Sequence, residues 1–234
     1  MKNDLFSIGP FTVHGYGLMI AIGVLSAYYM VEYRAKKKQM DWEKVFPLTV
    51  WSVLGGFLGS KILYLLTRLP DILANPALLG SSIKDGFVVY GGIIGGILTA
   101  WIYCKCTKWN FWKIFDIAMP AVAMAQGFGR IGCLLAGCCY GRELDPANPI
   151  GIVFHNSAYA PNDVALLPTQ IISSVLDFAN CFVLLALSKK LKTDGQVASC
   201  YLIFYSIGRF VIEFFRGDII RGSVGILSTS QFIS

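Results

Sequence analysis

The chain has 234 residues, of which 55% are hydrophobic and 15% are charged, with a formal net charge of +6 and a mean hydropathy of +0.60. Globular proteins in water carry about 25% charged residues, whereas the charges here stand in clumps between long apolar runs. This composition excludes a disordered chain, a coiled coil and a small disulfide-stapled secreted domain.

The apolar runs are long enough to be membrane-spanning helices. A helix needs about 20 apolar residues to cross a hydrocarbon core about 30 Å thick, and the runs do not alternate polar with apolar residues as barrel strands do. We therefore expect an all-α, polytopic membrane helical bundle in a single domain, 1–234. The six predicted transmembrane helices cover residues 11–31, 46–66, 86–103, 114–135, 168–187 and 197–215.

The basic residues predict the orientation of the chain, because Lys and Arg gather on the cytoplasmic side of a membrane. Eleven of the 20 lie in the connections after the first, third and fifth runs, six lie on the opposite side and three lie within runs. The N-terminus is therefore predicted outside. The positive net charge then indicates topology and contact with anionic membrane lipids, and no nucleic acid is expected as a partner.

Two connections on the predicted outer side are long. Residues 67–85 mix Leu and Ile with Pro and Asn, which is typical of a short helix at the membrane interface. Residues 136–167 are rich in Gly, Pro, Asn and Asp and are predicted to be irregular. Long ordered loops of this kind often cover a functional site.

Paired glycines in the second and third runs have small-xxx-small spacing, which allows helices to approach closely. They are Gly55-Gly56 with Gly59, and Gly91-Gly92 with Gly95-Gly96. Packing is the expected role of the first set. For the second set, packing and exposure of backbone at a site beside Tyr90 both remain open.

Arg130 is the most informative ionisable residue within the runs, because a charge in hydrocarbon needs a partner or a purpose. Its planar guanidinium matches a phosphate group better than other side chains do. Gly127, Gly129, Gly132 and Gly137 flank it and are expected to leave room for a bulky polar ligand. The alternative is an arginine that extends to the outer headgroups.

The last run places Tyr205, Arg209, Glu213 and Arg216 on one helix face, at steps of 4, 4 and 3 residues. This face cannot point into lipid. Neutralisation of Arg209 by Glu213 and a role in substrate binding are both open.

Four other polar residues have expected roles that are mainly structural. We expect Lys61 and Asp116 to pair or to reach the interface. Asp177, in the middle of a run, is ambiguous between structure and function. His14 is expected to be a hydrogen-bonding group at the interface rather than a base.

Three of the seven cysteines, Cys133, Cys138 and Cys139, lie close to Arg130 in the sequence. None has the C-x2-C spacing of a zinc site, so no metal site is expected. Adjacent cysteines are strained when they pair with each other, so a disulfide from Cys133 or simple packing is favoured. A membrane thiol-redox protein is the alternative that reactive pairing among these thiols would indicate.

Several motifs resemble, in order, those of the bacterial prolipoprotein diacylglyceryl transferase family over about residues 5–234. They are HGYGLM, GGFLGSKILYLL, VYGGIIGG, GRIGCLLAGCCYG, PTQ, YSIGRFVIEFFRGD and LSTSQFIS. The resemblance implies a multi-pass enzyme of the bacterial plasma membrane with its active site toward the outer leaflet. It implies that the diacylglyceryl group of phosphatidylglycerol is transferred to the lipobox cysteine of a prolipoprotein signal peptide, with no cofactor, metal or nucleotide.

The site residues expected from the motifs and this resemblance fall into two groups. The predicted catalytic residues are Tyr90, Arg130 and Arg209, and the predicted substrate-binding residues are Arg130, Tyr16, Gly132 and Tyr205. Arg130 and Arg209 are expected to stabilise the departing phosphate.

The chain departs from the family pattern near this expected site. Tyr90 stands where many members have His, Cys133 and Ala136 where they have Asn, Cys138 where they have Glu, and Lys61 where they have Arg. A phenol titrates near 10, so Tyr90 needs a nearby cation to act as a base. Alternatively, Tyr90 orients the substrate, and the thiol loses its proton to water or to another group.

The end of the chain also departs from the pattern. The family continues into a seventh span, whereas this sequence stops at Ser234, which predicts a truncated or divergent chain. These departures leave a second hypothesis, a catalytically altered lipid-binding or transport paralogue.

Overall fold

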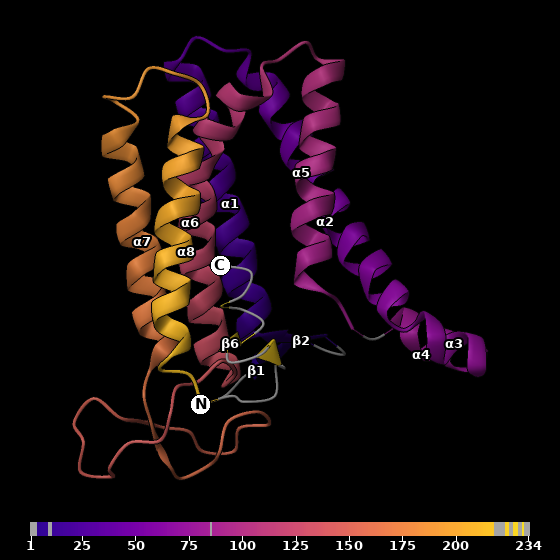
Figure 1. Ribbon diagram of the computed structural model, residues 1–234, viewed down its shortest axis with the longest axis vertical. Coiled ribbons are helices and arrows are strands. Elements are labelled where there is room, and N and C mark those ends of the chain that lie inside the picture. The colour runs from indigo at the N-terminus through magenta and orange to yellow at the C-terminus, as the bar shows by residue number, and fades with distance from the viewer. Residues whose placement is uncertain are drawn as a thin grey trace. The chain divides into compact units, whose positions relative to one another are not determined.

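The computed structural model describes residues 4–8, 11–84, 86–217, 223–224, 227–228 and 231 (Figure 1). The chain forms two compact units, the first made of Met1–Val31 and Phe115–Ser234 and the second of Glu32–Ile114. The single transferase domain stays a prediction. Most of the C-terminal LSTSQFIS motif lies outside the described residues.

The first unit begins with a β-hairpin rather than with a helix. Strands β1 (Asp4–Ile8) and β2 (Phe11–His14) pair antiparallel, with Asp4 opposite His14. Helix α1 (Gly15–Lys37) follows directly. The prediction of a helix from residue 11 is therefore wrong at its start, because the aromatic and β-branched residues of 11–13 favour a strand once they have a partner.

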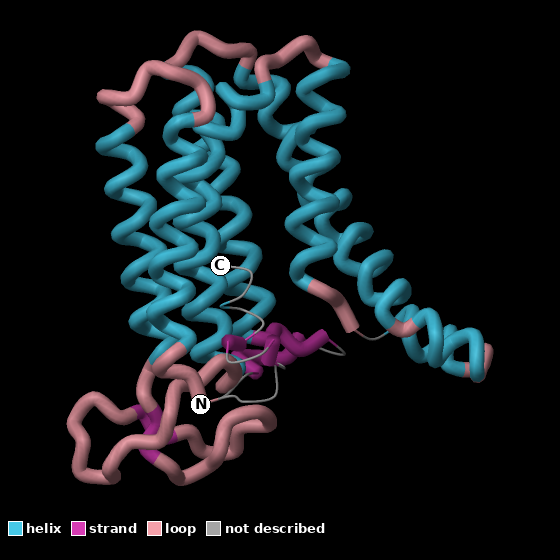
Figure 2. Tube along the Cα trace, in the orientation of Figure 1, coloured by secondary structure: helices cyan, strands magenta, loops and turns pink. Residues whose placement is uncertain are grey.

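Helices α6 (Phe111–Ala136), α7 (Thr169–Leu187) and α8 (Gln196–Glu213) run side by side with α1 (Figures 1 and 2). The Ser174 hydroxyl of α7 donates to the Gly127 carbonyl of α6 over 2.9 Å. Gly23 lets α1 approach the backbone of α6 at Ala125. The core between α6, α7 and α8 contains the buried residues Met119, Ala123, Cys181, Leu184, Val197, Ala198 and Tyr201.

Asp116 of α6 caps the start of α8. Its two carboxylate oxygens accept hydrogen bonds from the backbone N–H groups of Gly195 and Ala198, each over 2.8 Å. Asp116 is only 5% exposed, so the capping group is buried and comes from another helix. The expectation that Asp116 is paired is confirmed.

The loop between α6 and α7 is mostly irregular, as predicted. It contains a short hairpin of β3 (Ile152–Val153) and β4 (Ala165–Leu166) and its own small buried cluster of Phe154, Ala160 and Leu166. A final pair, β5 (Ser223–Val224) and β6 (Leu227–Ser228), follows α8.

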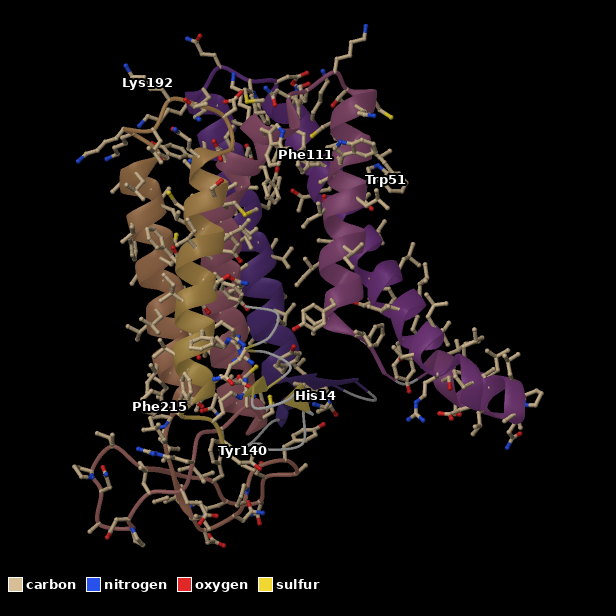
Figure 3. The ribbon with its side chains drawn as sticks, viewed as in Figure 1. His14, Trp51, Phe111, Tyr140, Lys192 and Phe215 are labelled. Carbon is tan, nitrogen blue, oxygen red and sulfur yellow. The ribbon has the colours of Figure 1, made fainter. Side chains whose placement is uncertain are left out.

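The start of this loop is tied to the end of α8. The Arg142 N–H donates to the Phe215 carbonyl over 2.9 Å, and the Gly217 N–H donates to the Tyr140 carbonyl over 3.2 Å. Figure 3 shows Tyr140 and Phe215 at this end of the unit and Lys192 at the opposite end. The loop therefore covers the end of the bundle away from the lysines after α7.

The second unit contains the 3₁₀ helix η1 (Trp42–Lys44) and helices α2 (Val45–Thr67), α3 (Leu69–Ala74), α4 (Leu78–Lys84) and α5 (Val89–Cys106). The short helix predicted within 67–85 is observed as two, α3 and α4, and its place at the membrane interface stays a prediction. The Lys61 ammonium donates to the Gly86 carbonyl over 3.1 Å and lies 4.6 Å from the Phe87 ring centroid, which confirms that Lys61 is paired.

The paired glycines of both runs pack α2 against α5. A Cβ atom on Gly59 would collide with the Gly91 carbonyl oxygen, and one on Gly95 would collide with the Gly55 carbonyl oxygen. The two backbones are therefore in direct contact. Packing, which was the expected role of the first set, explains the second set as well.

Five helical segments within the described part of the chain are long and apolar enough to cross a membrane. They are Gly15–Lys37, Trp42–Thr67, Val89–Cys106, Phe111–Ala136 and Thr169–Leu187. Helix α8, the sixth predicted span, has 18 residues like α5 but does not meet this criterion, because it carries the polar and charged residues that face α6 and α7.

We predict that Asp116→Ala lowers the free energy of unfolding by about 1–3 kcal/mol, because two buried N–H groups lose their acceptor. Asp116→Asn keeps one acceptor oxygen, so its free energy of unfolding is expected to lie between those of the wild-type protein and Asp116→Ala. Denaturant unfolding of the protein in detergent measures the change.

The control is Asp71→Ala, which removes an exposed pair with Arg68 and is expected to change stability by less than about 1 kcal/mol. Equal effects of Asp71→Ala and Asp116→Ala would contradict the capping role.

Candidate functional site

A small cavity lies between α6, α7 and α8 of the first unit, where charged side chains meet inside an apolar bundle. It has a volume of about 40 Å³. The lining residues are Arg130, Ser173, Leu176, Asp177, Asn180, Phe204, Tyr205, Gly208, Arg209 and Ile212.

Arg130 and Asp177 form a loose ion pair across this cavity. The Arg130 Nε and Asp177 Oδ2 atoms are 3.9 Å apart, and the two side chains are 22% and 11% exposed. This distance is longer than a hydrogen bond, so the guanidinium keeps donor capacity for a ligand. Asp177, which was ambiguous in the sequence, belongs to the site.

Arg209 and Glu213 form a tighter pair within α8. The Arg209 Nη2 and Glu213 Oε2 atoms are 2.7 Å apart and both side chains are largely buried. The spacing of four residues places them one turn apart on the same helix face. Neutralisation of Arg209 by Glu213 is therefore confirmed, and a role of Arg209 toward substrate stays a prediction.

Tyr205 is positioned at the cavity by a neighbouring ring. The Tyr201 and Tyr205 rings are stacked, with centroids 5.8 Å apart and planes at 17°. The Tyr201 hydroxyl donates to Oε1 of Gln126 over 2.9 Å. Because Tyr201 is anchored to α6, it fixes where the Tyr205 ring can lie.

Gly132 and Tyr16 lie against each other at the contact of α6 with α1. A Cβ atom on Gly132 would lie 3.2 Å from Cδ2 of Tyr16 and 3.3 Å from Cβ of Met19. Gly132 thus has a packing role in this structure, and the substrate-binding roles of Gly132 and Tyr16 stay predictions.

Two other flanking glycines, Gly127 and Gly137, also differ from expectation. The space beside Gly127 is filled by the Phe178 ring, and the space beside Gly137 by Ser157 and Phe154. The expectation that these two glycines leave room for a ligand is wrong, because neighbouring side chains occupy that room.

Tyr90 belongs to the second unit, in the first turn of α5, and is 42% exposed. The other predicted site residues all belong to the first unit. The catalytic role of Tyr90 therefore stays a prediction.

The polar face of α7 supplies residues that the sequence did not single out. Ser173 and Asn180 line the cavity with Asp177, and the buried Asn180 Oδ1 has no hydrogen-bond partner among the described residues. The sequence contained a signal for this face, because polar residues recur at steps of three and four within an apolar run. They are Gln170, Ser173, Asp177 and Asn180.

The turn after α6 is fastened to the start of α7. The Thr169 hydroxyl donates to the Cys139 carbonyl over 2.9 Å, and Nε2 of Gln170 donates to the Cys138 carbonyl over 2.8 Å. No disulfide joins Cys133, Cys138 or Cys139 in the described part of the chain, so the disulfide alternative is not observed.

Comparison with known proteins relates the whole chain to one family. The family model described as prolipoprotein diacylglyceryl transferase matches residues 3–234. A phosphatidylglycerol–prolipoprotein diacylglyceryl transferase of Clostridium tetani is 46% identical over 100% of this chain and 92% of its own length. One of Clostridium perfringens, numbered 2, is 46% identical over 100% and 90%, and one of Dehalococcoides mccartyi is 31% identical over 90% and 80%.

Proposed function

The chain belongs to the prolipoprotein diacylglyceryl transferase family, and on this basis we propose that it transfers a diacylglyceryl group from phosphatidylglycerol to a cysteine thiol of a prolipoprotein. It is a multi-pass protein of the bacterial cytoplasmic membrane. The observation that best supports a substrate site is the cavity at Arg130. There, a guanidinium with unused hydrogen-bond donors lies in an apolar bundle.

The reaction exchanges one bond for another at a glycerol carbon. The cysteine sulfur forms a bond to this carbon, the bond from the carbon to the phosphate oxygen breaks, and glycerol phosphate leaves. A thiol attacks only as thiolate, so its proton passes to a base or to water, and negative charge develops on the departing phosphate.

Arg130 is the residue we assign to this developing charge. A fork of donors on a permanent cation suits phosphate oxygens, and partial exclusion of water strengthens the interaction. Asp177, at 3.9 Å, attracts the guanidinium but is too far away to accept a hydrogen bond from it. The donors of Arg130 are therefore left for the phosphate. Arg209 also lines the cavity, but Glu213 at 2.7 Å offsets its charge, so we assign it the smaller part.

The apolar rim of the cavity suits a lipid. Leu176 and Phe204 line it and are 45% and 40% exposed, so acyl chains can pass along them while the phosphate reaches Arg130. The signal peptide of the prolipoprotein, with its lipobox cysteine, is the second substrate we propose.

We predict that Arg130→Ala lowers kcat/KM for transfer by about 10²–10³-fold, the usual effect of removing one preorganised donor to a developing anion. Arg130→Lys keeps the charge and loses the fork of donors, and it is expected to be intermediate. The assay uses purified protein, phosphatidylglycerol and a lipobox peptide, and mass spectrometry detects the diacylglyceryl thioether.

The matched control is Arg142→Ala. Arg142 is an exposed residue of the loop between α6 and α7, lies over the ring of Phe215 and does not line the cavity. Full activity of Arg130→Ala would overturn the assignment. A wild-type protein that binds phosphatidylglycerol but forms no thioether would instead favour the lipid-binding paralogue.

For Tyr90 we predict that Tyr90→Phe lowers kcat by about 10²-fold, as expected when a group that handles a proton is removed. Tyr90→His restores the residue of many family members and is expected to keep activity. The same assay at several pH values measures both variants.

The control for the phenol is Tyr159→Phe, because Tyr159 is an exposed loop residue. Unchanged turnover of Tyr90→Phe would exclude the phenol from proton transfer.

A further inference from the structure

Three cysteine thiols meet at the end of α6. Cys133 is in the last turn of the helix, and Cys138 and Cys139 are in the turn that follows it. The three Sγ atoms all lie within 4.8 Å of one another, and all three side chains are partly buried. We assign none of them a role in the transferase reaction.

The backbone, rather than chance side-chain rotation, brings these sulfurs together. Gly137 and Cys139 have φ values of 72° and 61°, in the left-handed region, and the Cys138 N–H donates to the Cys133 carbonyl over 3.0 Å. A non-glycine residue in this conformation costs of order 1–3 kcal/mol. The conformation is held because α7 binds the carbonyls of Cys138 and Cys139.

We propose that Cys133, Cys138 and Cys139 form a three-thiolate binding site for one thiophilic metal ion. Thiolates select soft and borderline ions such as Cu⁺, Zn²⁺ and Cd²⁺. With Zn–S bonds of about 2.3 Å, three sulfurs around one ion lie roughly 4 Å apart, which the observed cluster allows. Binding of a divalent ion releases three protons, one from each thiol, and forms three metal–sulfur bonds.

The surroundings favour the charge of such a complex. A divalent ion with three thiolates carries one net negative charge, and Arg130 lies one helical turn before Cys133 and within electrostatic range of Cys133 and Cys139.

The spacing of the cysteines hides this site in the sequence. Four residues separate Cys133 from Cys138, and the next cysteine is adjacent, which matches no C-x2-C pattern. Only the return of the chain after Gly137 places the third thiol beside the other two. The spacing argument against a metal site therefore does not apply to thiols that the fold brings together.

Cadmium titration of the full-length protein tests this site. The protein is reduced in detergent, Cd²⁺ is added, and the ultraviolet thiolate-to-cadmium absorption and the mass of the intact complex are recorded. We expect one Cd²⁺ per chain. Cys133→Ser, Cys138→Ser and Cys139→Ser are each expected to weaken binding at least about 100-fold, since the loss of even an outer partner of a metal ligand costs about 10–100-fold.

The matched control is Cys106→Ser, because Cys106 is an exposed cysteine of the second unit and should leave binding unchanged. No thiolate absorption in the wild-type protein, or equal affinity of Cys133→Ser and Cys106→Ser, would overturn the proposal. Three separate ligand variants keep the test valid if one of them fails to fold. Neither lipid nor peptide is present, so the result is independent of the transferase assay.

Discussion

Compensation of charge inside apolar helices is the constraint on which the first unit depends. A charge in hydrocarbon is costly, and the charged residues between α6, α7 and α8 face one another rather than lipid. Arg130 pairs with Asp177, and Arg209 pairs with Glu213. The carboxylate of Asp116 accepts hydrogen bonds from backbone N–H groups at the start of α8. The contacts of Arg130 and Asp116 cross between helices and therefore fix which faces of the three helices meet.

The two ion pairs differ in a way that matters for binding. The Arg209–Glu213 distance is 2.7 Å and the Arg130–Asp177 distance is 3.9 Å, so the charge of Arg209 is offset by its partner, whereas Arg130 retains donors for an incoming anion. The cavity beside them is small, and the apolar Leu176 and Phe204 line it as well. An amphiphile with a phosphate group therefore matches the site in both its charged and its apolar parts.

Much of this arrangement could be predicted from the sequence, because hydrophobic runs and helix ends are local properties. The run at 168–187 is observed as Thr169–Leu187, and the pairing of Arg209 with Glu213 follows from a spacing of four residues. Contacts that depend on how helices meet could not be predicted. The filling of the space beside Gly127 by Phe178, the recruitment of Asn180 to the cavity and the meeting of three cysteine sulfurs all require the packed bundle.

The central claim is that Arg130 recognises the phosphate of phosphatidylglycerol, and lipid binding measures it most directly. Native mass spectrometry is done on the wild-type protein and on Arg130→Gln, each with phosphatidylglycerol and with uncharged diacylglycerol. The comparison distinguishes recognition of the phosphate from recognition of the acyl chains. The account predicts that the wild-type protein retains phosphatidylglycerol at a concentration at least about tenfold lower than diacylglycerol, corresponding to about 1.4 kcal/mol, and that Arg130→Gln loses this preference. An unchanged preference in Arg130→Gln would contradict it.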